Sequence, residues 1–352
     1  MRWRGPADVL DTAVASAQHT ILLSMAGGPM RFRGWLRRAL LCLAAAAAVG
    51  CDKSGTGPVN PPSPNYVHLQ SDNGDYIGIG QTYNYTHADA VIRLTASGGH
   101  VSISIEGDQW WFGDFQSPST LTRLQPGNYT NLQRGELDWS GEGRGCNTLS
   151  GWFAIDSVTY AGDSLTAIDL RFEQHCEDVQ AALHGTIHWR ADDTTRPPGP
   201  VNPAPGGLWA PAPGSTPSAG SFIYLRSDAG DWVGAGQTYT YTAGFAVTTN
   251  AGHVSVSVDA AQWWYGDFQT MNTLTRLEPG YYPDLRRYPF HNPVKGGLDW
   301  SGEGRGCNTL LGWFAVDRVT YTNGTLTALD LRFEQHCEGG TTALHGVIRW
   351  DR

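Results

Sequence analysis

The sequence predicts two tandem all-β domains, each an antiparallel, jelly-roll-like β-sandwich, joined by a proline-rich linker. Three observations lead to this prediction: apolar and polar residues alternate with a period of two, one long unit occurs twice, and prolines gather between its copies. One-sided alternation requires one covered and one solvated face in each sheet, which favours a sandwich; a squat barrel is the alternative. The 352 residues are enough for two domains of ordinary size.

The alternation is clearest in two matching segments. In HVSISIEG (100–107) the side chains of Val101, Ile103 and Ile105 fall on one face of an extended strand, and HVSVSVDA (253–260) repeats the pattern. About eight such runs per unit, separated by glycine-rich turns, leave no helical stretch of useful length. We therefore expect strands throughout both copies.

The composition excludes one class of partner. Glycine (44 residues) and proline (20) imply many turns and an extended linker, while an aromatic content of 11% provides bulk for hydrophobic cores. The formal net charge of −9 leaves no cationic surface to displace the counterions of a phosphate backbone. We expect no nucleic-acid partner.

The amino-terminal region has the features of an export signal. Four arginines precede an apolar run that begins at Ala39 and ends at Gly50, which is shorter than the roughly 20 residues that a spanning helix needs. We expect residues 1–29 to be a mis-called upstream segment, with the working start at Met30, and residues 30–50 to be the signal peptide. The basic residues are Arg31, Arg33, Arg37 and Arg38.

The end of this run, Ala48-Val49-Gly50-Cys51, resembles the lipobox of bacterial lipoproteins. The resemblance implies that Cys51 is lipidated after cleavage and holds the mature chain on a lipid bilayer, at the periplasmic face or the cell surface. Residues 51–65 are then a short linker. An ordinary secretory signal followed by an incidental cysteine is the alternative.

Two copies of one unit follow, at residues 66–190 and 222–352. Positions 136–176 and 297–337 are identical at 32 of 41 places, which indicates duplication of a whole domain. The repeat resembles β-sandwich modules of exported bacterial proteins. The second copy carries a longer loop at 286–297, where two binding sites can diverge. The linker at 191–221 holds eight prolines, which predict a semi-rigid, partly polyproline spacer.

The cysteines predict one disulfide within each copy. Each copy has two, thirty residues apart, and exported chains meet an oxidising compartment. We predict the bonds Cys146–Cys176 and Cys307–Cys337. A zinc site would need two more ligands in each copy, and no CxxC or HxxxH pair supplies them.

A Trp-Trp pair in each copy suggests a platform for a sugar ring. Neighbouring residues on a strand point to opposite faces, so only one of Trp110 and Trp111 can be core. An outer tryptophan beside Asp114 has the composition of a carbohydrate-stacking surface. The alternative is that the following loop covers it.

A glycine-rich loop that repeats the sequence LDWSGEGRGCNT is expected to be held by the disulfide. Asp138 and Arg144 are either structural, one bonding turn amides and the other pairing with a carboxylate, or part of a binding rim. The outward row Asp169, Arg171, Glu173 and His175 indicates cross-strand ion pairs, and its last two residues border the same rim. The expected ligand-binding residues are Trp110, Trp111, Asp114, Trp139, Glu142, Arg144, Glu173 and His175, with Trp263, Trp264, Asp267, Trp300, Glu303, Arg305, Glu334 and His336 in the second copy.

One further loop resembles a hard-cation loop in composition. Asp72 and Asp75, matched by Asp228 and Asp231, precede glycines, so calcium is a candidate ligand, although the EF-hand spacing is absent. An ordinary Asx turn is the alternative.

These features favour a non-catalytic lipoprotein whose two modules bind a glycan or another envelope ligand. Two weak sites on one chain gain avidity, whereas an enzyme gains little from a second copy. Two alternatives remain: a polysaccharide hydrolase that uses Glu142 with Glu173 and Glu303 with Glu334, or a purely structural envelope protein.

Overall fold

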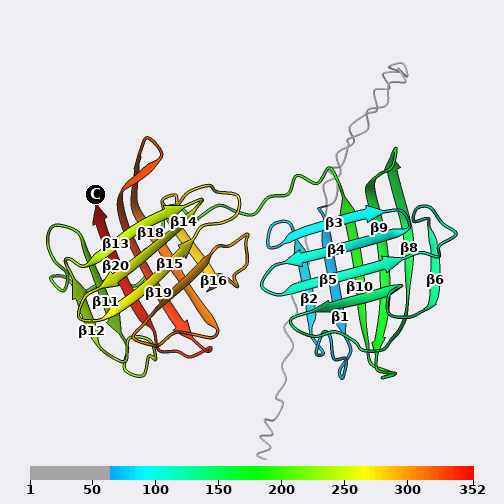
Figure 1. Ribbon diagram of the computed structural model, residues 1–352, viewed down its shortest axis with the longest axis horizontal. Coiled ribbons are helices and arrows are strands. Elements are labelled where there is room, and N and C mark those ends of the chain that lie inside the picture. Colours follow the sequence, from blue (N-terminus) through cyan, green and yellow to red (C-terminus); the bar gives the residue numbers. More distant parts are fainter. Residues whose placement is uncertain (1–63) are drawn as a thin grey trace, which may run out of the picture. The chain divides into compact units, whose positions relative to one another are not determined.

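The computed structural model describes residues 64–352, and there the chain forms twenty β-strands and no helix (Figure 1). The predicted all-β class is confirmed. The predicted upstream segment 1–29, the signal peptide 30–50 and Cys51 lie outside the described residues. Within the described range, no helix has the length and apolar character needed to cross a membrane.

Each copy contains ten strands rather than the eight expected. The first copy comprises β1 (Tyr66–Ser71), β2 (Thr82–Thr86), β3 (Val91–Ser97), β4 (His100–Glu106), β5 (Trp110–Gln116), β6 (Gly127–Leu132), β7 (Leu137–Gly141), β8 (Leu149–Ala161), β9 (Ser164–Cys176) and β10 (Ala182–Arg190). The second comprises β11 (Phe222–Ser227), β12 (Thr238–Tyr241), β13 (Phe245–Asn250), β14 (His253–Asp259), β15 (Trp263–Gln269), β16 (Gly280–Arg287), β17 (Gly297–Gly302), β18 (Leu310–Thr322), β19 (Thr325–Cys337) and β20 (Leu344–Asp351).

The strands of the first copy form two sheets that pack face to face. One sheet has the order β2-β1-β10-β9-β8-β6 and the other the order β3-β4-β5-β7. In Figure 1 strands β3, β4 and β5 form a layer that crosses strands β8 to β10. Most strands pair with their neighbours in sequence, whereas β1 pairs with β10, so the two ends of the first copy lie side by side in one sheet of the sandwich.

The second copy repeats this arrangement with one difference. Its ten strands form one continuous sheet because β16 pairs in parallel with β17 at Arg286 and Gly297, and this pairing joins the two layers along one edge. At the matching edge of the first copy there is only an isolated parallel bridge between Arg134 and Leu137.

Each copy has its own hydrophobic core. The core residues of the first copy run from Val67 to Ile187, and those of the second from Ile223 to Ile348. The layers meet through stacked and edge-on aromatic rings, for example Phe115 of β5 against Phe153 of β8, with ring centroids 5.5 Å apart. Burying one such side chain contributes about 1.5–3 kcal/mol, so these rings supply much of the stability of each module.

The buried tryptophan of β7 requires a glycine on its neighbouring strand. A Cβ atom added at Gly113 of β5 would lie 2.3 Å from Cε3 of Trp139, and one at Gly266 would lie 2.3 Å from Cε3 of Trp300. Only glycine therefore allows the indole ring to lie flat against β5 or β15.

Both predicted disulfides are present. Cys146 bonds Cys176 and Cys307 bonds Cys337, each joining the loop after β7 or β17 to the end of β9 or β19. The bonds lie within their copies.

Part of the predicted spacer at 191–221 lies against the second module. Val201 forms a two-way backbone bridge with Tyr281 of β16 at 2.9 Å, and the indole of Trp209 stacks on His345 of β20. This segment is more than a spacer, because its backbone and one side chain cover part of the module that follows it.

Candidate functional site

The strongest candidate surface is the outer face of the smaller layer, around the Trp-Trp pair. Alternation along β5 puts Trp111 in the core, fully buried, and leaves Trp110 38% and Phe112 49% exposed. In the second copy Trp263 is 47% and Tyr265 53% exposed, and their rings meet edge to face with centroids 5.8 Å apart. The following loop does not cover the outer tryptophan in either copy.

Small hydroxyl side chains flank these rings in both copies. Phe112 lies between Ser104 of β4 and Ser140 of β7 in the strand register. Tyr265 of β15 lies between Ser257 of β14 and Ser301 of β17 in the same way. We call this surface the aromatic face: Trp110, Phe112, Ser104 and Ser140 in the first copy and Trp263, Tyr265, Ser257 and Ser301 in the second.

Two carboxylates stand directly opposite each other beside the aromatic face. Asp114 of β5 pairs in register with Asp138 of β7, and Asp267 pairs with Asp299. Burial raises the pKa of Asp138, and burial raises the pKa of Asp299 to about 6, with Arg287 opposing the shift. A carboxyl group that titrates near neutral pH can both donate and accept a hydrogen bond.

Asp138 is therefore not the turn-capping residue that we considered in the sequence. Its strand places it next to Asp114, whose Oδ1 lies 2.9 Å from Nε2 of His100. In the second copy the distance from Asp267 to His253 is 2.8 Å. The sequence did not reveal these acid pairs, because β5 pairs with β7 and not with the next strand along the chain.

The two copies differ at this polar end, as the longer loop suggested. In the second copy, Tyr288 stacks on His253 with centroids 4.5 Å apart, and Nε of Arg287 lies 3.7 Å from Oδ1 of Asp299. The side chain of Asp267 is consequently 25% exposed, whereas that of Asp114 is 51% exposed. The first copy presents the more open carboxylate.

The glycine-rich loop after β7 borders the aromatic face and is held from several sides. Glu142 accepts a hydrogen bond at 2.8 Å from the backbone N–H of Trp110, and Arg144 donates through Nε to the carbonyl of Ile77 at 2.7 Å. The Arg144 guanidinium also lies over the Trp111 ring, 5.8 Å from its centroid. Arg144 thus bonds a carbonyl and stacks on a ring, and does not pair with a carboxylate as one interpretation of the sequence supposed.

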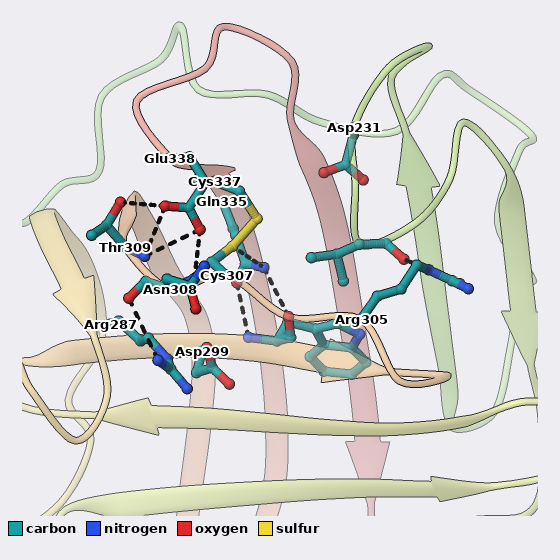
Figure 2. The surroundings of a disulfide bond; sticks show 12 residues. Asp231, Arg287, Asp299, Arg305, Cys307, Asn308, Thr309, Gln335, Cys337 and Glu338 are labelled. Carbon is teal, nitrogen blue, oxygen red and sulfur yellow. Dashed lines mark hydrogen bonds and ion pairs between the residues drawn. A yellow bond between two sulfur atoms is a disulfide. The ribbon is translucent and has the colours of Figure 1, made fainter. Parts of the chain in front are cut away.

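Figure 2 shows how the second copy holds the same loop. The disulfide Cys307–Cys337 lies beside Gln335, whose Nε2 donates to the carbonyl of Trp300 at 2.8 Å. Glu338 accepts from the backbone N–H of Asn308 at 2.6 Å and from the Thr309 hydroxyl at 3.0 Å. Glu177 does the same in the first copy, and these backbone N–H groups lower the pKa of both glutamates.

Four of the expected ligand-binding residues are core residues. Trp111, Trp139, Trp264 and Trp300 are all fully buried. Trp111 also donates from its indole N–H to the hydroxyl of Tyr85 at 2.8 Å. They support the aromatic face from beneath and have no surface to offer a ligand.

The charged row of β9 lies on the outer face of the other layer, away from the aromatic face. Phe172 and Gln174 point into the core, so Glu173 points outward, where its carboxylate lies 3.1 Å from His175 and 3.3 Å from His184. In the second copy Glu334 contacts His336 at 3.1 Å and His345 at 3.0 Å, and these imidazoles lower its pKa to about 2. Arg171 pairs with Asp156 at 2.7 Å, the cross-strand ion pair that the alternating charges indicated.

This placement separates the carboxylates of the proposed hydrolytic pair. Glu142 belongs to the loop beside the smaller layer, whereas Glu173 points away from that layer on the outer side of the larger one. Packed sheets are about 10 Å apart, so two carboxylates on opposite outer sides cannot share one glycosidic bond.

The aspartates considered for calcium make turn contacts. Asp75 is buried and accepts from the Ser71 hydroxyl at 2.7 Å and from the backbone N–H of Gly78 at 2.7 Å, an Asx turn. Asp231 repeats these contacts with Ser227 and Gly234, while Asp72 and Asp228 accept from the backbone at Ala182 and Ala343. Between residues 64 and 352, no group of three His, Cys, Asp or Glu side chains is placed to hold a metal ion.

The comparisons with known proteins add little to this geometry. No family model matches the chain, and no curated protein matches it. Among solved structures, the chain is similar to a protein of unknown function of the DUF3598 family from Nostoc punctiforme, at 9% sequence identity and a TM-score of 0.18, over 82% of this chain and 94% of that chain. A TM-score this low carries no argument about fold or function.

Proposed function

We propose that this chain is an exported, lipid-anchored protein whose two modules bind a glycan without catalysis, each through its aromatic face. The observation that carries the proposal is the duplicated pair of exposed rings, Trp110 with Phe112 and Trp263 with Tyr265. Solvent-exposed aromatic side chains on one strand lose hydrophobic stabilisation unless a ligand covers them, and sugar C–H groups stack on such rings.

The neighbouring polar groups suit a ligand rich in hydroxyl groups. Serine hydroxyls lie on both sides of the central ring, and a carboxylate pair follows at the next outward position along the strands. Sugar hydroxyl groups both donate and accept hydrogen bonds, so serine hydroxyls and carboxylate oxygens can each serve as their partners. The rigid β-strands hold these groups in place before a ligand binds, which reduces the entropic cost of binding.

Export and lipid attachment are proposed from two supports. The lipobox-like sequence ends at Cys51, and each module holds a disulfide, a bond that persists in oxidising compartments. Two modules on one tethered chain would bind a repetitive polymer with an avidity about 10²-fold or more above that of one module.

The test is a glycan array followed by calorimetric titration of the intact chain. The variants W110A/F112A and W263A/Y265A each remove one aromatic face, and we expect either to lose most of the avidity and their combination to abolish binding. Y66A is the matched control, because Tyr66 is 37% exposed on the larger layer of the first copy. Absence of binding to every polysaccharide, with unchanged tryptophan fluorescence, would overturn the proposal.

A further inference from the structure

The outer faces of the two larger layers carry the same side chains. We call this surface the histidine face: Trp152, Arg171, Glu173 and His184 in the first copy and Trp313, Arg332, Glu334 and His345 in the second. Cross-strand register places His184 opposite Glu173 and His345 opposite Glu334. This surface lies on the larger layer, not on the smaller one that carries the aromatic face.

The second histidine face is covered by the linker. The indole of Trp209 stacks on His345 with ring centroids 4.7 Å apart and an angle of 17° between the rings. Its backbone carbonyl accepts a hydrogen bond of 2.8 Å from Nη1 of Arg332. The His345 side chain is consequently only 9% exposed, and Trp313 is buried.

Both side chains that receive the linker are held in position by carboxylates. Arg332 uses Nε and Nη2 to bond Asp317, at 2.7 and 2.8 Å, which leaves Nη1 for the carbonyl of Trp209. The two ring nitrogens of His345 face Glu334 at 3.0 Å and Asp228 at 3.4 Å, which fixes the plane of the imidazole for stacking.

The first histidine face has the same contacts between its arginine, its histidine and the neighbouring carboxylates, but no linker segment within the described residues packs on it. Arg171 bonds Asp156 through Nε and Nη2 at 2.7 and 2.8 Å, and no described residue accepts from its Nη1. The ring nitrogens of His184 face Glu173 at 3.3 Å and Asp72 at 3.5 Å. Here the histidine side chain is 39% exposed and the arginine side chain 50% exposed.

The linker before the first module has no aromatic side chain that could take the place of Trp209. Residues 52–65 contain no aromatic residue, whereas the second linker places Trp209 within the sequence PAPGGLWAPAP (203–213). The segment between Cys51 and the first module therefore offers no counterpart of Trp209 for His184.

We propose that the first histidine face is a docking site for an extended, proline-flanked segment that carries a tryptophan and belongs to a partner protein. The indole stacks on His184, and the carbonyl of the same residue accepts from Nη1 of Arg171. Proline-rich segments lose little conformational entropy on docking, and a tryptophan supplies a large rigid anchor. Residues 203–213 are the intramolecular example of such a segment.

The experiment titrates a synthetic peptide of residues 203–213 into the intact chain and measures stoichiometry and affinity by calorimetry. We expect the wild type to bind one peptide and H184A to bind it at least about tenfold more weakly. A peptide in which leucine replaces the tryptophan should not bind. W209A exposes the second face, so the stoichiometry rises to two, and W209A/H184A returns it to one.

Three outcomes would overturn the proposal. The first is a wild-type chain that binds no peptide while W209A binds one, which would show that only the second face accepts the segment. The second is peptide binding that H184A leaves unchanged. The third is self-association of the wild type that W209A abolishes, seen by sedimentation, which would identify a second copy of this chain as the occupant. Matching thermal melts of the variants exclude misfolding, since His184 is a surface residue.

Discussion

The side chain of Gln174 hydrogen-bonds both backbone polar groups of Trp139. Its Oε1 accepts from the Trp139 N–H at 2.7 Å, and its Nε2 donates to the Trp139 carbonyl at 2.8 Å. Gln174 is fully buried, and this contact joins β9 of one layer to β7 of the other beside the disulfide. Gln335 and Trp300 repeat it in the second copy.

Replacing this glutamine should destabilise the first module. The variant Q174L leaves one buried N–H and one buried carbonyl without partners, at about 1–3 kcal/mol each, so we expect a loss of about 3 kcal/mol in the free energy of unfolding. Urea unfolding followed by tryptophan fluorescence measures it. The exposed Gln133 provides the control, Q133A, which should change stability by less than about 0.5 kcal/mol. Equal stability of Q174L and wild type would show that the pair is dispensable.

The acid pair of the second copy predicts that removing the charge of Asp299 stabilises the fold, and that this effect depends on pH. Because burial raises the folded-state pKa of Asp299 to about 6, above its ordinary 3.8, this carboxyl destabilises the fold above pH 6 and ceases to do so as the pH falls towards 4. Arg287 and Asp267 are its charged neighbours. D299N should therefore stabilise the chain by about 1–3 kcal/mol at pH 7 and have little effect near pH 4.

Stability measured against pH checks this expectation. D259N is the control, because Asp259 is an exposed carboxylate of the same module, and its stability profile should follow that of the wild type. A stabilisation by D299N that persists unchanged at low pH would mean that packing, and not the titration of Asp299, is responsible.

Each disulfide should contribute substantially to its module. Closing a loop between cysteines 30 positions apart stabilises a domain by about 3–4 kcal/mol in the chain-entropy model, so C307S/C337S should lose that amount in urea unfolding. C146S/C176S should behave alike, since the bond lies at the same place in the first copy. Labelling of these four cysteines by iodoacetamide in the unreduced protein would contradict the prediction.

The glycine beneath the buried indole predicts a packing defect. In G113A the new methyl group would lie 2.3 Å from the Trp139 ring, so the ring or the strand must shift, at about 1–3 kcal/mol of stability. Thermal unfolding measures the loss. G206A is the control, because no atom lies within 4 Å of the added carbon in the linker. Wild-type stability of G113A would show that the layers can separate locally without cost.

The parts of the fold that depend on local alternation were predictable. Val101, Ile103 and Ile105 lie in the core as their period of two required, and one tryptophan of each pair is outside. The same alternation also contained a signal that we did not use: Gln174 follows Leu170 and Phe172 in phase, which marks it as an inward polar residue that needs a buried partner.

The parts that depend on long-range pairing were not predictable. Asp114 and Asp138 are brought together because β5 skips β6 and pairs with β7, and nothing in either segment encodes that register. The cover over His345 depends on where the chain outside the module runs, and a linker rich in proline and glycine has no periodicity to indicate a packing partner.

The stacking of Trp209 on His345 has a consequence for how duplicated proteins diversify. The two modules keep matching residues on this surface, yet one surface is occupied by its own chain and the other is open. A single tryptophan in the connecting segment therefore sets how many such surfaces the molecule offers. New binding capacity can thus be gained or silenced by a change between the modules, while both folded units keep their sequence.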